Sequence, residues 1–544
     1  MLSDFDPNQI QDEGARQAIV ELMNLVEDLK QENATLREEV QRLRDENRRL
    51  KGEQGQPQIK PGKKKPSNHS SESERRQAKG WGKGSKNDRI TIDREERLAV
   101  EGTSLPADAE FKGYEEVVVQ DLSIKTDNIR FLKEKFYSAK ERMSYTASLP
   151  AGYQGQFGPG IRALVLVQYY SCGMSEPKIQ EFLENFGVRI SAGQISNQLI
   201  KNQAAWQREK EAIYQAGLSS SSWQHIDETG TRVDGVNHYC HIICNPLYTA
   251  YFTRPHKDRL TVISLLQNRP DLQFLLNRQT LSRLAGFALP QWVQRAVSHW
   301  PQDLVLSQAE MEDLVQRELN RLNAQQQARL YEAAALSAYY QQPLVPVVPV
   351  LVSDEARQYE AVTPEQALCW VHEGRHYKKL SPYLAYHQQQ RAEFLTQFWK
   401  FYHHLQRYRA DPTPDQAHRL RADFDTLFST VTGYQALDNL IAKTKTKKEK
   451  LLKVLDYPEI PLHNNPAELG ARQRVRKRDV SFGPRTDDGL AAWDTFMTLA
   501  ATAQKLGVSF FAYVYDRVTE HNTLPSLAAL IQQRSPVSHP ITLG

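Results

Sequence analysis

The sequence lacks any apolar run long enough to cross a membrane. Its most apolar stretch, PLVPVVPVLV at 343–352, is short and interrupted by prolines, whereas a spanning helix needs about 18 to 20 consecutive apolar residues. The chain starts MLSDFDPNQI, which is acidic and has no apolar segment of the kind found in secretory signals. We therefore expect a cytoplasmic protein with no membrane partner.

Cysteine is also scarce. Cys172, Cys240, Cys244 and Cys369 are too few and too scattered for a disulfide framework in 544 residues. Two of them fall in HYCHIIC at 238–244, but that segment reads as a strand on which both lie on one face, and a structural zinc site needs four converging ligands. We expect no zinc.

Basic charge is concentrated in one segment. Lys51 to Arg89 contains eleven Lys and Arg residues against four acidic ones, so +7 of charge lies there, although the whole chain carries only +4. Residues 53–95 are rich in Gly, Pro, Ser and Lys, which predicts a flexible linker. The candidate phosphate contacts in it are Lys63, Lys64, Lys65, Arg75 and Arg76. A linker that is merely solvated explains the composition equally well.

Residues 1–52 carry a heptad repeat. Its d positions are Leu22, Leu29, Leu36, Leu43 and Leu50, and its a positions are Ile19, Val26, Asn33, Val40 and Asn47. β-branched residues at a with leucine at d favour a parallel two-stranded coil, and Asn33 and Asn47 fix its register at a cost in stability. We expect a leucine-zipper homodimer; the alternative is a single solvated amphipathic helix.

The pattern of residues after the linker predicts several further regions. We expect a small α/β module at 96–158, then a helix-turn-helix-like DNA-binding region at 159–215 whose second helix starts near Ser191. Ordinary helical packing explains the second region equally well. From 220 to 515 the pattern reads as three antiparallel strands, a helix, a strand and further helices, with helical insertions at about 270–342 and 384–450. Residues 516–544 read as a C-terminal tail, and the fold class is mixed α/β.

Three carboxylates are candidate metal ligands. Asp227 lies on the first of these strands and Asp354 ends the later one, so both reach one edge if the strands are neighbours in a sheet. Glu468 starts a basic helix, HNNPAELGARQRVRKR at 463–478. Hard oxygen ligands suit Mg²⁺ or Mn²⁺, which assist phosphoryl transfer.

The alternative, purely structural interpretation of Glu468 is that it caps the helix. Asn465 fits the N-cap, Pro466 the first helical position and Glu468 the third, where a capping-box glutamate reaches back to the cap. The two roles are compatible, because a glutamate at that position can also point into a cleft. The candidate phosphate contacts of this helix are Arg472, Arg476, Lys477 and Arg478; a solvated basic face is the alternative.

Four blocks of sequence in order resemble the insertion-sequence 66 family of transposases. They are HIDETGTRVDG at 225–235, LVSDEARQY at 351–359, CWVHEGRHYKK at 369–379 and the segment from 463 to 507. The resemblance implies a ribonuclease H-like core, in which a mixed sheet is flanked by helices. It also implies an Asp227, Asp354 and Glu468 triad, with Trp370 and His372 contacting the flanking DNA, bracing the site or only packing.

The same resemblance implies an activity and its partners. These are Mg²⁺-dependent or Mn²⁺-dependent cutting at transposon ends, joining to target DNA, a homodimer or higher oligomer, accessory transposition proteins, and a location at the prokaryotic nucleoid. Three features depart from the family pattern: residues 98–150 contain no cysteine, the interval from Asp227 to Asp354 is long, and His463 and Leu469 are unusual. Two other classes stay open: a coiled-coil DNA-binding regulator or inactive copy, and a nuclease or resolvase that cuts without joining.

Overall fold

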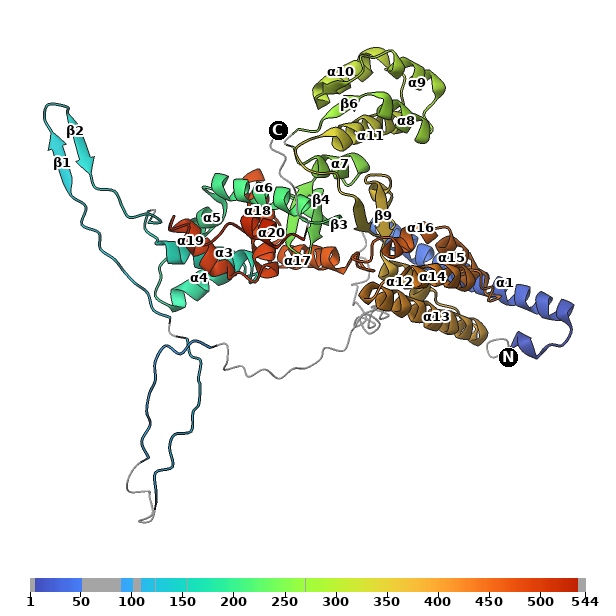
Figure 1. Ribbon diagram of the computed structural model, residues 1–544, viewed down its shortest axis with the longest axis horizontal. Helices are drawn as coiled ribbons and strands as arrows, with labels where there is room; N and C mark the ends of the chain where they lie inside the picture. Colours follow the sequence, from blue (N-terminus) through green and yellow to red (C-terminus); the bar gives the residue numbers. More distant parts are fainter. Residues whose placement is uncertain are drawn as a thin grey trace.

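The fold is described from a computed structural model (Figure 1). The structure describes residues 5–50, 90–100, 109–122, 124–153, 155–269 and 271–536. Most of the expected linker, including Lys63, Lys64, Lys65, Arg75 and Arg76, lies outside the described residues. No helix in the described ranges has the length and apolar character needed to cross a lipid bilayer.

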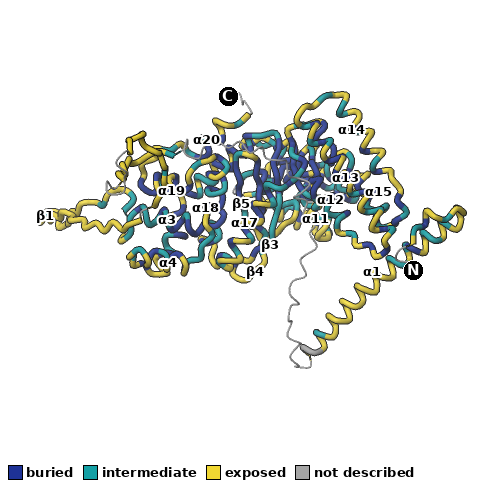
Figure 2. Tube along the Cα trace, turned by 90° about the horizontal axis from the view of Figure 1, so that it is seen from below, coloured by how far each residue is buried: buried dark blue, intermediate teal, exposed yellow. Residues whose placement is uncertain are grey.

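The N-terminal segment forms one long helix, α1 (Glu13–Leu50), after a short turn of helix η2 (Pro7–Gln9). Leu22, Leu29, Leu36 and Leu43 on its heptad face are each about half exposed, and most of the helix is exposed in Figure 2. The helix is therefore observed, whereas the coiled-coil dimer stays a prediction.

Another face of α1 packs against the rest of the chain. Met23 is buried, and Asn24 donates to the carbonyl of Gly433 at 2.9 Å. The carboxylate of Glu27 accepts from the backbone N–H groups of Tyr383 and Leu384. The heptad pattern does not reveal this contact, which leaves the leucine face uncovered.

The region expected to be a small α/β module contains a hairpin. Strands β1 (Lys135–Ser138) and β2 (Met143–Thr146) pair antiparallel, and no helix occurs among the described residues from 90 to 153. The expected helix is absent from this described part of the module.

Four helices follow: α3 (Pro159–Tyr170), α4 (Glu176–Asn185), α5 (Ala192–Ile200) and α6 (Ala204–Ser219). Ser191 caps α5, because its side chain accepts from the N–H of Gln194. The helix predicted to start near Ser191 is thus present, and its DNA-binding role stays a prediction.

A five-stranded mixed sheet forms the centre of the molecule. Its strands are β3 (Trp223–Val233), β4 (Val236–Asn245), β5 (Tyr248–Arg254), β8 (Val350–Ser353) and β9 (Glu365–Leu368), in the order β5-β4-β3-β8-β9. β3, β4 and β5 are antiparallel, whereas β8 pairs parallel with β3 and with β9. Asp234 and Gly235 both have positive φ in the β3–β4 turn, as a type I′ hairpin requires. The predicted meander and the mixed α/β class are confirmed.

Helix α18 (Asp487–Lys505) covers the β5 edge of this sheet. Asp494, Thr498 and Thr502 lie four residues apart on one face of the helix and accept hydrogen bonds from the backbone N–H groups of alternate β5 residues, at 2.6, 3.0 and 3.3 Å. An open edge strand would otherwise expose these donors to pairing with other chains.

Helix α17 (Asn465–Ser481) packs directly on β3 and β4. A Cβ at Gly470 would lie 2.9 Å from Ile242 of β4. Glycine therefore allows the close approach that brings the start of α17 to the sheet.

Helices fill both regions where insertions are expected. The first region follows α7 (Arg259–Gln267) and contains β6 (Phe274–Leu276), α8 (Arg278–Gly286), α9 (Gln291–Ser298), β7 (Leu304–Leu306), α10 (Gln308–Glu318) and α11 (Ala324–Gln341). The second follows α12 (Trp370–Lys379) and contains α13 (Ala385–Ala410), α14 (Pro414–Leu427), α15 (Gln435–Lys445) and α16 (Lys448–Leu451), which share an aromatic core with α12. The first also holds a two-stranded sheet, β6–β7, that the sequence reading missed.

Short 3₁₀ turns, η5 (Arg357–Tyr359) and η6 (Lys453–Leu455), join these parts. The expected C-terminal tail is largely folded: α19 (Phe510–Val518) packs near α3, and α20 (Leu527–Arg534) packs on α6. Leu527 and Ile531 of α20 are fully buried, so this helix belongs to the main core.

Candidate functional site

The sheet register brings Asp227 and Asp354 to the same level. His225 of β3 pairs with Val352 of β8, and two further residues along each parallel strand lead to the two aspartates. Neighbouring strands lie about 4.8 Å apart. The site is therefore at the carboxyl end of β8, where the adjacent strand β9 also ends.

Glu468 reaches this region from the first turns of α17. Its Oε2 atom accepts from Arg375 Nη2 of α12 at 3.0 Å. Its Oε1 atom lies 3.6 Å from His372 Nδ1, which is beyond hydrogen-bond distance, and has no hydrogen-bond donor among the described residues.

The capping interpretation of this helix start is wrong. The N-cap residue is Asn464, not Asn465, its side chain makes no cap hydrogen bond, and Glu468 is the fourth helical residue. The carboxylate of Glu468 is instead turned to α12. Asn464 and Asn465 both suit an N-cap by residue type, but the side chain of Asn464 binds His225 and the carbonyl of Ile226 instead.

Asn464 connects three parts of the site and is almost fully buried. Its Oδ1 atom is 2.8 Å from His225 Nδ1, its Nδ2 donates to the carbonyl of Ile226 at 2.7 Å, and its backbone N–H donates to Cys369 Sγ at 3.2 Å. Burial lowers the pKa of His225 to about 3, so this imidazole is neutral. Asn464 thereby fixes the start of α17 against β3 and α12.

Acidic side chains crowd this edge of the sheet. Burial, followed by the carboxylates of Glu228 and Asp354, raises the pKa of Asp227 to about 7, and Glu468 adds to the shift. Burial and Asp354 also raise the pKa of Glu228. The edge therefore favours a bound cation or proton, and perturbed carboxylates in such a place often mark functional sites.

Glu228 is an acidic neighbour that the sequence reading passed over. Its carboxylate accepts from the hydroxyl of Tyr359 and, at 2.9 Å, from Gln358 Nε2. Lys257 lies 3.8 Å away. Its partners are thus those of a structural anion, although the Asp-Glu pair at 227–228 is a signal for more than one carboxylate at this edge.

The carboxylates are suited to a hard divalent cation. Oxygen ligands of Asp and Glu are those that Mg²⁺ and Mn²⁺ prefer, and the donorless Oε1 of Glu468 offers one such oxygen. The three predicted ligands do not place their oxygens within 4.8 Å of one another; among the described residues, two other groups do.

The first of those groups is Cys369, His372 and Glu468. Burial raises the pKa of Cys369 to about 11, so it is a neutral thiol that accepts from Asn464. The second is Glu355, Glu373 and His376, where Lys447 already lies 2.7 Å from Glu355 and 2.8 Å from Glu373. A neutral thiol is a poor ligand for a hard cation, and Lys447 already neutralises the second group.

Trp370 lies in an aromatic core. It is fully buried, its indole N–H donates to the carbonyl of Leu451 at 2.8 Å, and its ring packs against Phe398 and Phe401. This environment fits the packing alternative. His372 is half-buried beside Glu468, where burial lowers its pKa, and its Nε2 atom lies 3.2 Å from Arg375 Nη1.

The basic residues of α17 divide into two groups. Arg472 and Arg476 are exposed and stay predicted phosphate contacts. Lys477 is buried: its Nζ donates to the carbonyl of Tyr169 at 2.6 Å, and burial lowers its pKa to about 6. The predicted phosphate contact of Lys477 is therefore wrong, because this side chain fastens α17 to α3.

Two other arginines, Arg474 and Arg375, were not predicted to contact phosphate or metal. Arg474 is fully buried, where it pairs with Asp494 at 3.4 Å and donates to Thr253 Oγ1 at 3.0 Å. Arg375 holds Glu468. A run of basic residues does not indicate which side chain will be buried. The contact between Arg375 and Glu468 forms only in the tertiary structure.

The structure is that of a mixed α/β protein with acidic side chains gathered at the carboxyl end of β8. The chain belongs to the IS66 family of transposases, whose family model matches residues 154–272 and 320–492, together more than half of the chain. The unmatched interval between the two segments holds β6 to α10 of the first insertion.

A relative is also found. An uncharacterized protein, y4jO, of Sinorhizobium fredii is 33% identical over 322 residues, which cover 59% of this chain and 99% of that protein. Its description states no activity, so the support for function comes from the family and from the site.

Proposed function

We propose that the protein is a DNA transposase that binds the terminal inverted repeats of a transposon and catalyses metal-dependent strand cleavage and strand transfer. The observation that carries the proposal is that Asp227 of β3 lies near enough to Asp354, after β8, and to Glu468, at the start of α17, for both carboxylates to raise its pKa. Membership of the family supports it. The sheet is then the ribonuclease H-like core that the sequence resemblance implies.

The three carboxylates are the proposed ligands of Mg²⁺ or Mn²⁺. When bound, such ions supply an activated attacking oxygen and a stabilised leaving oxygen in phosphoryl transfer. The residues of the chain position the carboxylates and neutralise their charge. Arg375 holds Glu468, Asn464 fixes α17 against β3, and the crowded charge around Asp227 favours a cation at that position.

The proposed DNA contacts are spread over several elements. They comprise helices α4 and α5, the exposed Arg472 and Arg476 of α17, Arg478 at its end, and the basic linker outside the described residues. Phosphate contacts of this kind position the protein, whereas base contacts specify sequence. We assign the sequence-reading role to α5 because its N-terminus follows the capped turn at Ser191.

A strand-transfer assay on the DNA that natively flanks the gene tests the proposal. A transposase produces both nicked ends and joined products when Mg²⁺ or Mn²⁺ is present. Nicked ends without joining would indicate the nuclease or resolvase alternative. Sequence-specific binding without any nicking, at every metal concentration, would indicate the regulator or an inactive copy.

A further inference from the structure

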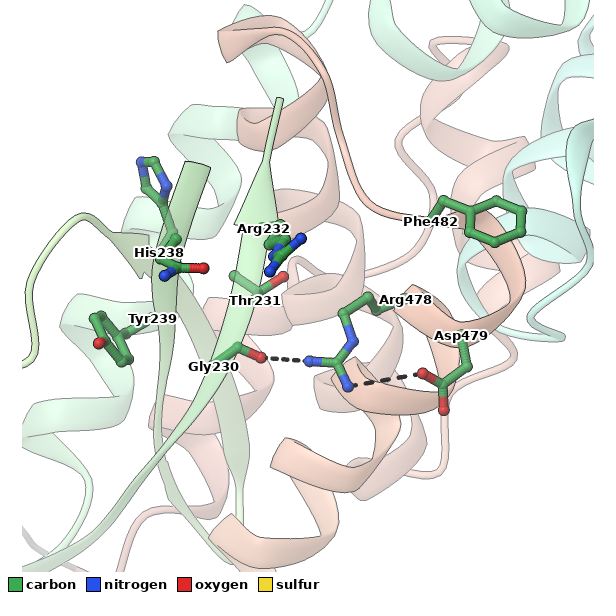
Figure 3. A pocket seen from close by; sticks show the side chains of 9 residues that line it. Gly230, Thr231, Arg232, His238, Tyr239, Arg478, Asp479 and Phe482 are labelled. Carbon is green, nitrogen blue, oxygen red and sulfur yellow. Dashed lines mark hydrogen bonds and ion pairs between the residues drawn. The ribbon is translucent and has the colours of Figure 1, made fainter. Parts of the chain in front are cut away.

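A cavity of about 600 Å³ lies between the β3–β4 hairpin and the C-terminal end of α17. Its lining includes Gly230, Arg232, His238, Tyr239, Arg478 and Phe482, shown in Figure 3. A volume of several hundred Å³ suits a molecule the size of a nucleotide. None of these side chains takes part in the carboxylate site.

Phe482 at the rim is held in an unfavourable conformation. It has a φ of 59°, in the left-handed region that bulky residues rarely adopt, and it is 86% exposed. Because the ring is exposed, it gains no packing energy that would offset the backbone strain. Such strain persists only where the surroundings enforce it, and it is found most often at functional sites.

The surroundings of Phe482 are rigid. A Cβ at the next residue, Gly483, would lie 2.8 Å from the carbonyl oxygen of Arg232, so the loop after α17 rests directly on β3. The hairpin tip is fastened to the same loop, because the N–H of Asp234 donates to the carbonyl of Pro484 at 3.1 Å. The ring is thus presented on a fixed support.

Two arginines line the same cavity as Phe482. Arg478 Nη1 donates to the carbonyl of Gly230 at 2.6 Å, which orients a guanidinium that has further N–H groups to offer. Its other neighbour is Asp479, at 3.7 Å. Arg232 is exposed, and Figure 3 shows it on the same side of the hairpin as Arg478. A guanidinium is well suited to a phosphate group.

The cavity lies along the strand that carries Asp227. Gly230 to Arg232 follow Asp227 by three to five residues on β3, which corresponds to about 10–17 Å at 3.3 Å per residue. Nucleotides repeat about every 3.4 Å along a DNA strand. A DNA strand that runs from the carboxylates along β3 would therefore place a nucleotide about three to five positions away at the cavity.

We propose that this cavity binds an unpaired nucleotide of the DNA, with its base stacked on Phe482 and its phosphate held by Arg232 and Arg478. This inference rests on the proposed function, since it assumes DNA at Asp227. An aromatic ring stacks on any base without reading its identity, and an apolar ring inserted at a base step unstacks it. The protein opens the duplex next to the position of cleavage.

Two substitutions separate this role from folding. Phe482→Asn removes the ring and suits the left-handed backbone, so the protein folds at least as well. Gly230→Val adds a side chain in open space, since a Cβ there meets no atom within 4 Å, and valine favours strands. Both variants are tested with duplexes carrying the terminal inverted repeat and 2-aminopurine at successive positions beside the cleavage position.

The wild type should increase 2-aminopurine fluorescence several-fold at one or two adjacent positions when it binds in EDTA, and both variants should lose this increase. Phe482→Asn should also cleave paired DNA about tenfold more slowly, and mismatches at those positions should restore the rate to within about threefold. Phe482→Trp should keep both properties. Phe511→Ala, which removes an exposed ring on α19, is the matched control.

Failure of the inference and of the proposed function can be told apart. If the wild type cleaves but both variants keep the fluorescence increase and the cleavage rate, the nucleotide site is overturned and the transposase proposal stands. If the wild type cleaves no duplex, paired or mismatched, in any divalent metal, the proposed function is overturned. The fluorescence in EDTA then still decides the nucleotide site.

Discussion

Asp227 is an acidic side chain buried among other carboxylates. Its raised pKa, about 7 against about 3.9 in an unfolded chain, means that the folded protein binds this proton more tightly than the unfolded chain. The free energy of unfolding therefore falls as the pH rises from about 4 to about 7. A divalent cation offsets this loss, because it replaces the proton.

Asp227→Asn removes the buried charge. Without added metal, we expect the variant to exceed the wild type in free energy of unfolding by about 1–3 kcal/mol at pH 8, and by little near pH 4. Urea unfolding in EDTA measures this difference. Mn²⁺ at pH 8 should stabilise the wild type alone. The control is Asp313→Asn, at an exposed position, and equal behaviour of both variants would refute the electrostatic account of Asp227.

Asn464 and Asn465 are adjacent, chemically identical residues with different expected effects. Asn464→Ala leaves His225 and the carbonyl of Ile226 buried without their partner, which should cost about 2–4 kcal/mol of stability and lower activity. Asn465→Ala should cost less than about 1 kcal/mol. Chemical denaturation of both variants decides between them, since the capping interpretation requires the reverse order.

At the residue scale, the sequence predicted that Asp227 and Asp354 lie on or just after neighbouring strands, but not which groups surround them. Asp227 could be placed because it lies in a segment with an alternating strand pattern. Asp354 could be placed because it follows a short, apolar strand. Asn464, Arg375 and Glu228 act through contacts between β3, α12 and α17, and no spacing in the chain encodes such contacts. Lys477 was misassigned for the same reason: its partner Tyr169 is 308 residues away.

At the element scale, the position of α17 depends on Gly470. In Gly470→Ala the new Cβ meets Ile242 at 2.9 Å, so the helix must move from β4 and carry Glu468 with it. We expect a loss of about 1–3 kcal/mol and a marked loss of cleavage. Gly160→Ala is the matched control, because a Cβ in that helix meets no atom within 4 Å.

Thermal unfolding and cleavage rates measure both glycine variants. The control should be neutral or slightly stabilised, as alanine is the better helix former. If Gly470→Ala matches the control in both measurements, close packing of α17 does not position the site. Periodicity predicted the strands and most helices well, but it could not give the distance between a helix and a sheet.

At the scale of the whole molecule, α1 has two faces with different tasks. Asn24 and Glu27 dock the helix on the second insertion, while the heptad leucines stay exposed. Since the docking face and the leucine face differ, one helix can bind its own chain and a second copy together. The sequence predicted the leucine face; the docking, the folded tail and the extra β6–β7 sheet come from long-range packing that it does not reveal.

The expected species in solution is a dimer of twice 62.4 kDa. Light scattering on the double variant Leu29→Asp, Leu36→Asp should give the mass of one chain, because charges at two d positions abolish coil packing. Asn24→Ala, on the docking face, should stay dimeric. A wild type that is monomeric at micromolar concentration, or a double variant that stays dimeric, would contradict the leucine-zipper assignment.

The central claim is that carboxylates at the end of β8 perform metal-dependent DNA cleavage, and the most direct test compares neighbouring acids. Asp354→Asn should lower the rate of end cleavage in Mg²⁺ at least about a thousandfold, because a ligand worth several kcal/mol is lost, while DNA binding is kept. Glu355→Gln, which removes the adjacent acid paired with Lys447, should cleave within a few-fold of the wild type. Retained cleavage by Asp354→Asn would contradict the account.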